Sequence, residues 1–85
     1  MPSHGQIRLR KVWAMLDVCA LGYRRVKRTH NWWVMYGEKT YRHLPLGPHG
    51  KQTNPDIQIG HVKNMVRHLG IDGCAKRELP HLFGR

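Results

Sequence analysis

The stretch HNWWVMYGEKTYRHLPL, residues 30–46, carries the clearest hairpin signal in the chain. Aromatic and branched side chains dominate residues 30–36, and such residues favour an extended strand. The Gly-Glu pair at 37–38 is typical of a tight turn. A further strand is expected over residues 40–46, stopping at Pro45 because proline cannot donate a ladder hydrogen bond. The stretch therefore predicts an antiparallel hairpin.

A helix and a short strand are expected before the hairpin. From Arg8 to Leu21 the apolar residues recur with a helical period, and Gly22 provides a C-terminal stop. Residues 23–27 are then a candidate strand, and Arg28-Thr29 a turn into the hairpin. Three consecutive strands with short connections predict a meander.

Two helices are expected after the hairpin. Residues 46–55 are rich in turn formers and predict a loop. A second helix should begin between residues 56 and 60 and end at Gly70, and Asp72 could cap a last short helix over residues 73–79. The buried stripe of the second helix is expected to consist of Ile59, Val62, Met65, Val66 and Leu69.

The order of these elements predicts an α+β fold of two layers, in which a three-stranded antiparallel sheet carries two helices on one face and a short helix follows. Both helices must cover the same face to form one core. Eighty-five residues suffice for a single domain, residues 1–85, with tails at 1–7 and 80–85. No apolar run reaches the length of a membrane span, and the N-terminus lacks a secretory h-region. We therefore expect a cytoplasmic protein that does not bind membranes.

Charge is the strongest global feature of the sequence. Fifteen Lys and Arg residues against five Asp and Glu give a net charge of +10. Such a field attracts polyanions, chiefly nucleic acid, with an anionic membrane surface as the second option. Charge alone does not distinguish RNA from DNA.

The cysteines and histidines give little sign of a metal or redox site. Cys19 and Cys74 form no C-x-x-C pair and are too few for a disulfide scaffold, so two small buried thiols are expected. His61 and His68 are two helical turns apart, too far to share a metal ion in the usual manner. We expect neither a metal nor a small-molecule cofactor.

His30 is the candidate catalytic residue. It lies at the start of the best strand, beside Lys27, Arg28 and Thr29, where an imidazole can be partly exposed with cations nearby. Imidazole is the side chain best suited to move protons near neutrality, and cations can stabilise charge growing on a phosphate. An ordinary histidine at the end of a strand is the plainer interpretation.

The adjacent tryptophans, Trp32 and Trp33, point to opposite sides of the strand. Either could stack on an unpaired base, as in proteins that bind single strands. In a domain of this size one of them is expected to anchor the core with Trp13, which leaves the other for the surface.

Several segments together resemble the HicA-type toxins, which are small mRNA interferases with a double-stranded-RNA-binding-domain-like α-β-β-β-α fold. A helix ends in Gly22-Tyr23 and leads to a basic strand, and a turn, residues 28–30, then ends in histidine. A loop with Pro48-His49 and the segment IGHVKNMVRHLGI, residues 59–71, complete the similarity. It extends from about Lys11 to the end of that segment.

The resemblance implies metal-independent cleavage of mRNA and inhibition by a HicB-type antitoxin protein. His30 falls on the family's essential histidine, and His49 matches the histidine of its Pro-x-His loop. The remaining expected RNA contacts are the basic and hydroxyl residues Lys27, Arg28, Thr29, Lys51, Lys63 and Arg67.

Two departures from the family keep other functions open. Arg28-Thr29 stand where the family has Gly-Ser, so a glycine turn is lost and a bulky cation stands near His30. The loop before His49 is expanded. The alternatives are a non-catalytic double-stranded-RNA-binding module of the same fold and DNA binding through the basic second helix.

Overall fold

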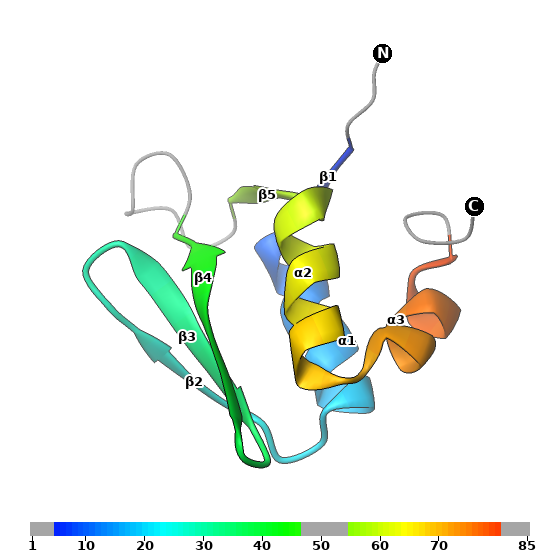
Figure 1. Ribbon diagram of the computed structural model, residues 1–85. Helices are drawn as coiled ribbons and strands as arrows, with labels where there is room; N and C mark the ends of the chain where they lie inside the picture. The colour runs from blue at the N-terminus through cyan, green and yellow to red at the C-terminus, as the bar shows by residue number, and fades with distance from the viewer. Residues whose placement is uncertain (1–4, 47–54, 81–85) are drawn as a thin grey trace.

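The computed structural model describes residues 5–46 and 55–80 of the chain (Figure 1). None of the described helices has the length and apolarity needed to cross a lipid bilayer. The elements are, in order, β1 (Gln6–Arg8), α1 (Leu9–Cys19), β2 (Arg24–Lys27), β3 (Asn31–Tyr36), β4 (Lys39–Pro45), β5 (Asp56–Gln58), α2 (Ile59–Leu69) and α3 (Asp72–Glu78).

The expected α+β layout with a three-stranded antiparallel sheet is confirmed. Its strand order is β2-β3-β4, and both pairings are antiparallel. Helices α1 and α2 lie on one side of this sheet, and α3 packs against the two helices away from it (Figure 1). Gly37 takes a positive φ of 61° in the β3–β4 turn, a conformation that glycine adopts without steric cost.

The expected boundaries need small corrections. Helix α1 begins at Leu9 and ends at Cys19, inside the expected range of residues 8–21. Helix α2 begins within its expected window and ends at a left-handed Gly70, as predicted. Asp72 does not cap α3: it is the first helical residue, and Ile71 occupies the N-cap without a side-chain hydrogen bond. A helix that begins one residue earlier places the carboxylate inside the first turn.

Strands β1 and β5 form a second small sheet that the sequence analysis did not anticipate. They pair antiparallel, with Ile7 opposite Ile57, and both isoleucines are buried. Residues 6 and 7, expected to belong to a tail, are thus part of the folded domain. Each strand has only three residues, too few for the alternation that marks a strand in a sequence.

The two strand–helix units, β1–α1 and β5–α2, form equivalent backbone hydrogen bonds to each other. The backbone N–H of Leu9 donates to the Pro55 carbonyl at 2.9 Å, and that of Ile59 donates to the Gly5 carbonyl at 3.2 Å. Each unit thereby satisfies one of the free N–H groups at the start of the other unit's helix. Since both helices follow paired strands directly, they begin side by side.

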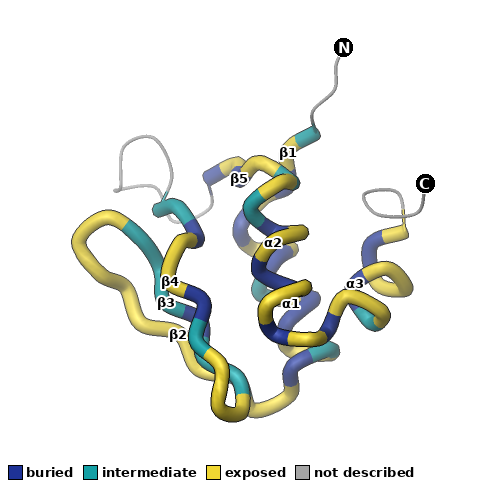
Figure 2. Tube along the Cα trace, viewed as in Figure 1, coloured by how far each residue is buried: buried dark blue, intermediate teal, exposed yellow. Residues whose placement is uncertain are grey.

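The core lies between the helices and the sheet. Buried residues recur along α1 and α2, whereas β2 is exposed along its length (Figure 2). The expected stripe of α2 is buried except for Ile59, which is half-buried. The main core residues are Val12, Met15 and Leu16 from α1, Val34, Tyr41 and Leu44 from the sheet, and Val62, Met65, Val66 and Leu69 from α2.

The expectation of two buried thiols is wrong. Cys19 at the end of α1 and Cys74 in α3 form a disulfide, with their Cα atoms 5.5 Å apart. Both cysteines are half-buried. The pairing depends on how α3 folds back onto α1, a tertiary contact between residues 55 positions apart. No local pattern in the sequence could indicate it.

Reduction of the disulfide should lower the free energy of unfolding by about 4 kcal/mol, the value that loop-closure entropy gives for this separation. Guanidinium unfolding followed by circular dichroism, with and without reductant, measures the difference. A Cys19→Ser/Cys74→Ser variant should show the same loss and no response to reductant. A loss below about 1 kcal/mol would mean that the core alone holds α3 in place.

Candidate nucleic-acid interface

The turn between β2 and β3 presents His30 to solvent. The Arg28 N–H donates to the Asn31 carbonyl at 2.9 Å and closes a turn whose central residues are Thr29 and His30. Both central residues are exposed. His30 therefore belongs to the turn, although the sequence predicts it as the first residue of the strand; β3 begins at Asn31.

The turn does not require the glycine that the resemblance leads one to expect. No non-glycine residue in the described part of the chain has a positive φ, so Arg28, Thr29 and His30 all have ordinary backbone conformations. Replacement of Gly-Ser by Arg28-Thr29 consequently introduces no left-handed strain. The backbone at the candidate site is compatible with the residues that this chain carries.

The Arg28 side chain lies over the sheet, against Trp33. Its guanidinium carbon is 4.7 Å from the centre of the Trp33 ring, and the guanidinium of Arg42 in β4 is 4.9 Å from the same ring. Cation–π attraction at such distances is worth about 0.5–1 kcal/mol at exposed sites. These contacts give the Arg28 guanidinium a packing site on the sheet surface, next to the turn that carries His30.

A second arginine–tryptophan cluster joins the sheet to α1. Trp13 and Trp32 meet edge to face with ring centres 5.1 Å apart, so Trp32 is the tryptophan that anchors the core. The Arg25 guanidinium lies 4.3 Å from the Trp13 ring and donates a 2.8 Å hydrogen bond to the Tyr23 hydroxyl. Burial raises the pKa of Tyr23, and the Arg25 cation opposes that rise.

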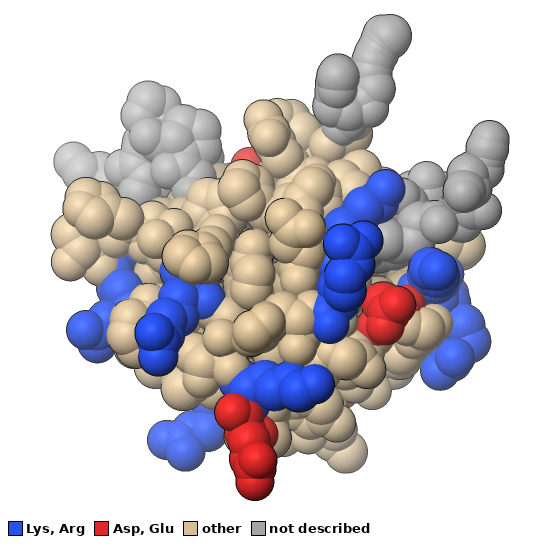
Figure 3. Space-filling model, in the orientation of Figure 1, with Lys and Arg blue, Asp and Glu red and all other residues tan. Residues whose placement is uncertain are grey.

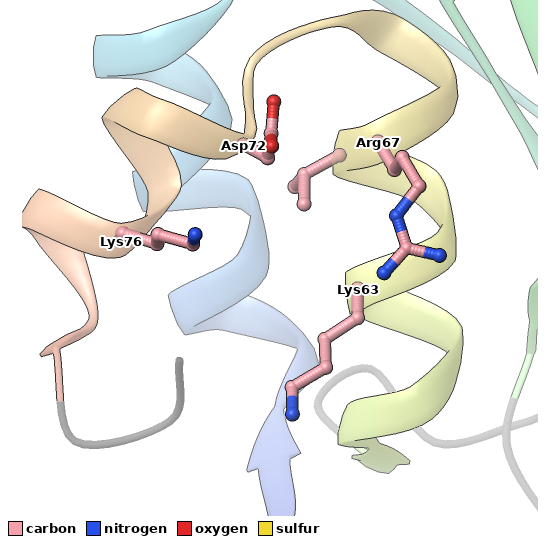
Figure 4. A pocket seen from close by; sticks show the side chains of 5 residues that line it. Lys63, Arg67, Asp72 and Lys76 are labelled. Carbon is pink, nitrogen blue, oxygen red and sulfur yellow. The ribbon is translucent and has the colours of Figure 1, made fainter. Parts of the chain in front are cut away.

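Lys63 and Arg67 lie apart from this turn. They line a hollow between α2 and α3 together with Val66, Asp72 and Lys76 (Figure 4). The opposite side of α2 packs on the sheet (Figure 1), so the helix separates the hollow from the sheet. The predicted RNA contacts are thus divided between two surfaces.

The remaining residues that were predicted to contact RNA lie in different parts of the chain. Lys27 is exposed in β2, where it pairs with Trp32 on the side of the sheet that faces the helices. His49 and Lys51 lie outside the described residues. In the described segments 5–46 and 55–80, no three His, Cys, Asp or Glu side chains come close enough to hold a metal ion.

His68 has a structural role. Its Nε2–H donates to the backbone carbonyl of Thr40 at 3.0 Å, and its ring lies 5.9 Å from that of Tyr41. It thereby connects the end of α2 to β4. The basic face that the sequence assigns to the second helix is consequently not all available to a ligand.

Basic side chains gather on more than one part of the surface. In the view of Figure 3 they lie over the sheet on the left and over α2 and α3 on the right, where acidic side chains lie among them. Arg24 and Arg42 belong to the sheet and were missed as candidates. The signal that could have identified Arg24 is its two-residue spacing from Val26 and Arg28, which places the three on one face.

Comparison with protein-family models, curated proteins and solved structures finds no significant match to this chain.

Replacement of Arg25 by Gln should lower the free energy of unfolding by about 1 kcal/mol, because it removes the cation over Trp13 and the hydrogen bond to Tyr23. Thermal unfolding by circular dichroism measures the loss. Arg24→Gln is the matched control, since it removes the same charge from an exposed neighbour on the other side of β2. Equal effects of the two variants would assign the loss to net charge.

Proposed function

We propose that the protein is a HicA-like, metal-independent endoribonuclease in which His30 is the proton carrier. The observation that carries this proposal is the exposed position of His30 at a hydrogen-bonded hairpin turn, with the cations Lys27 and Arg28 next to it in the chain. The hydrogen-bonded turn presents the imidazole at the surface, where a large substrate can reach it. The arrangement suits an extended polyanion better than a small enclosed ligand.

The proposed reaction is internal transesterification of RNA. His30 takes the proton of a 2′-OH while that oxygen attacks the adjacent phosphorus. The P–O5′ bond breaks, the leaving 5′ oxygen takes a proton from water, and the products carry a 2′,3′-cyclic phosphate and a 5′-OH. Arg28 would stabilise the negative charge that grows on the phosphoryl oxygens, and Lys27, on the other side of β2, would add to the positive field near the turn.

The order of the main elements supports the family assignment. From Leu9 to Leu69 the chain runs through α1, the meander β2-β3-β4 and α2, with β5 as a short addition before α2. This order is the one expected of the double-stranded-RNA-binding-domain-like fold, and we extend the proposal to that fold. A HicB-like antitoxin is the implied protein partner.

The disulfide bears on where the protein acts. Such bonds persist in oxidising compartments and are rare in the cytosol. If the protein acts in the cytoplasm, as its proposed function on mRNA requires, Cys19 and Cys74 should be reduced there. Rapid alkylation of the thiols in intact cells, followed by mass spectrometry, determines their state.

His30→Ala should reduce RNA cleavage in EDTA by about a hundredfold or more, because the general base is lost. Wild-type protein and variant are incubated with a structured mRNA, and the new ends are analysed for cyclic phosphate. His43→Ala is the matched control, since His43 is another exposed histidine of the same sheet and lies in β4. Its cleavage rate should stay close to that of wild type.

Two outcomes would contradict the catalytic assignment. Equal cleavage by wild type and His30→Ala would place the chemistry elsewhere. Absence of cleavage by both, with RNA binding intact, would identify the chain as the non-catalytic RNA-binding module. Competition between RNA and DNA at fixed salt tests the DNA-binding alternative.

A further inference from the structure

The side of the three-stranded sheet away from the helices carries a basic surface with an apolar centre. Strand alternation and register place one set of side chains there, since Val26 pairs with Trp33 and Arg24 pairs with Met35. No described helix covers this side of the sheet (Figure 1). We call it the outer face and define it by Arg24, Val26, Arg28, Trp33, Met35 and Arg42.

Trp33 holds two cations in place on the outer face. Because Arg28 and Arg42 lie 4.7 Å and 4.9 Å from the same ring centre, their guanidinium carbons are at most 9.6 Å apart. A β-bulge between Trp32 and Val34 gives β4 an extra residue opposite Trp33, in the segment that contains Arg42. Both arginines are exposed, so their N–H groups can reach a ligand while contact with the tryptophan favours side-chain positions over the ring.

The outer face contains no carboxylate. All five acidic residues of the chain lie in described segments, and none belongs to β2, β3 or β4. An anion bound here would therefore meet cations without a competing negative side chain on the strands. The acidic residues are Asp17 in α1, Glu38 in the β3–β4 turn, Asp56 in β5, and Asp72 and Glu78 in α3.

The apolar centre specifies what kind of anion fits. Trp33 and Met35 are half-buried, and Val26 keeps 40% of its surface exposed. The guanidinium planes that pack on Trp33 can themselves stack unpaired bases, while their N–H groups contact the phosphates. A duplex hides its base faces and could use only the cations. An acidic peptide would pair with the arginines but would gain little from the indole.

We propose that the outer face binds an unpaired segment of RNA, so that the substrate class of the protein is single-stranded RNA. The stacking site joins the candidate catalytic turn directly, because Arg28 both packs on Trp33 and precedes Thr29-His30. A strand stacked on the Arg28 guanidinium would thus lie next to the turn that carries His30. The link to cleavage rests on the proposed function, whereas the binding itself does not require it.

The test measures binding in the His30→Ala background, so that cleavage does not interfere. Fluorescence anisotropy at fixed salt follows an unstructured RNA of about 12 nucleotides and a duplex of the same sequence. Trp33→Leu should weaken single-strand binding about tenfold and leave duplex binding nearly unchanged. Arg28→Gln/Arg42→Gln should also weaken it about tenfold and retains Trp33, so its effect is interpretable if Trp33→Leu fails to fold.

The matched control is Lys76→Gln/Arg77→Gln, which removes the same charge from α3. It should change single-strand affinity by about threefold or less, the general effect of lower net charge. Circular dichroism verifies that each variant is folded. Ultraviolet crosslinking and peptide mass spectrometry should place the RNA on β2, β3 or β4.

Specific outcomes would overturn the inference. One is that the Arg28→Gln/Arg42→Gln variant binds single-stranded RNA as tightly as the wild-type protein does. Another is that the protein binds duplex RNA more tightly than single-stranded RNA. A third is that an acidic peptide, but not unlabelled RNA, displaces the labelled RNA. Failure of the proposed function looks different: single-strand binding would depend on the outer face, yet wild-type protein would not cleave RNA. If cleavage requires His30 but is unchanged by Trp33→Leu and by Arg28→Gln/Arg42→Gln, the single-strand site on the outer face is rejected and the proposed function is retained.

Discussion

Burial of Val34 is the constraint on which both surfaces of the sheet depend. Val34 is completely excluded from solvent at the centre of β3, so the side of the strand that carries it must face α1 and α2. Strand alternation then sends Trp32 toward the core, where it meets Trp13, and Trp33 to the outer face. A shift of one residue would exchange the two tryptophans and dismantle both arginine clusters.

The segments before and after the three-stranded sheet contact each other through residues that are distant in the sequence. The Ile7–Ile57 pair starts α1 and α2 side by side, and the reciprocal hydrogen bonds to Pro55 and Gly5 fix the first turn of each helix. At the other end of α1, the disulfide holds α3 against it. The hollow with Lys63 and Arg67 lies between α3 and the side of α2 that faces away from the sheet, so those cations are not part of the surface near His30.

Arginine stacked on tryptophan occurs on both sides of the hairpin, with different consequences. Arg25 lies over Trp13, so its side chain helps join the sheet to α1. Arg28 and Arg42 flank Trp33 on a face that no described element covers, so their side chains are held in position and still open to solvent. The same contact therefore stabilises the fold on one side and prepares a binding surface on the other. Position in the sheet decides which role an arginine takes.

The amino-acid sequence by itself determined the local elements: the hairpin after His30, the apolar stripes of both long helices, the stop at Gly70 and the strong positive charge. These features depend on residues a few positions apart. Only the tertiary structure decided that β1 pairs with β5, that Cys19 bonds to Cys74, and that Lys63 lines a hollow between α2 and α3. It also showed that the Arg28 side chain, which the sequence places beside His30, packs on Trp33. The reason is physical: each depends on how distant segments pack, which local periodicity and turn chemistry do not encode.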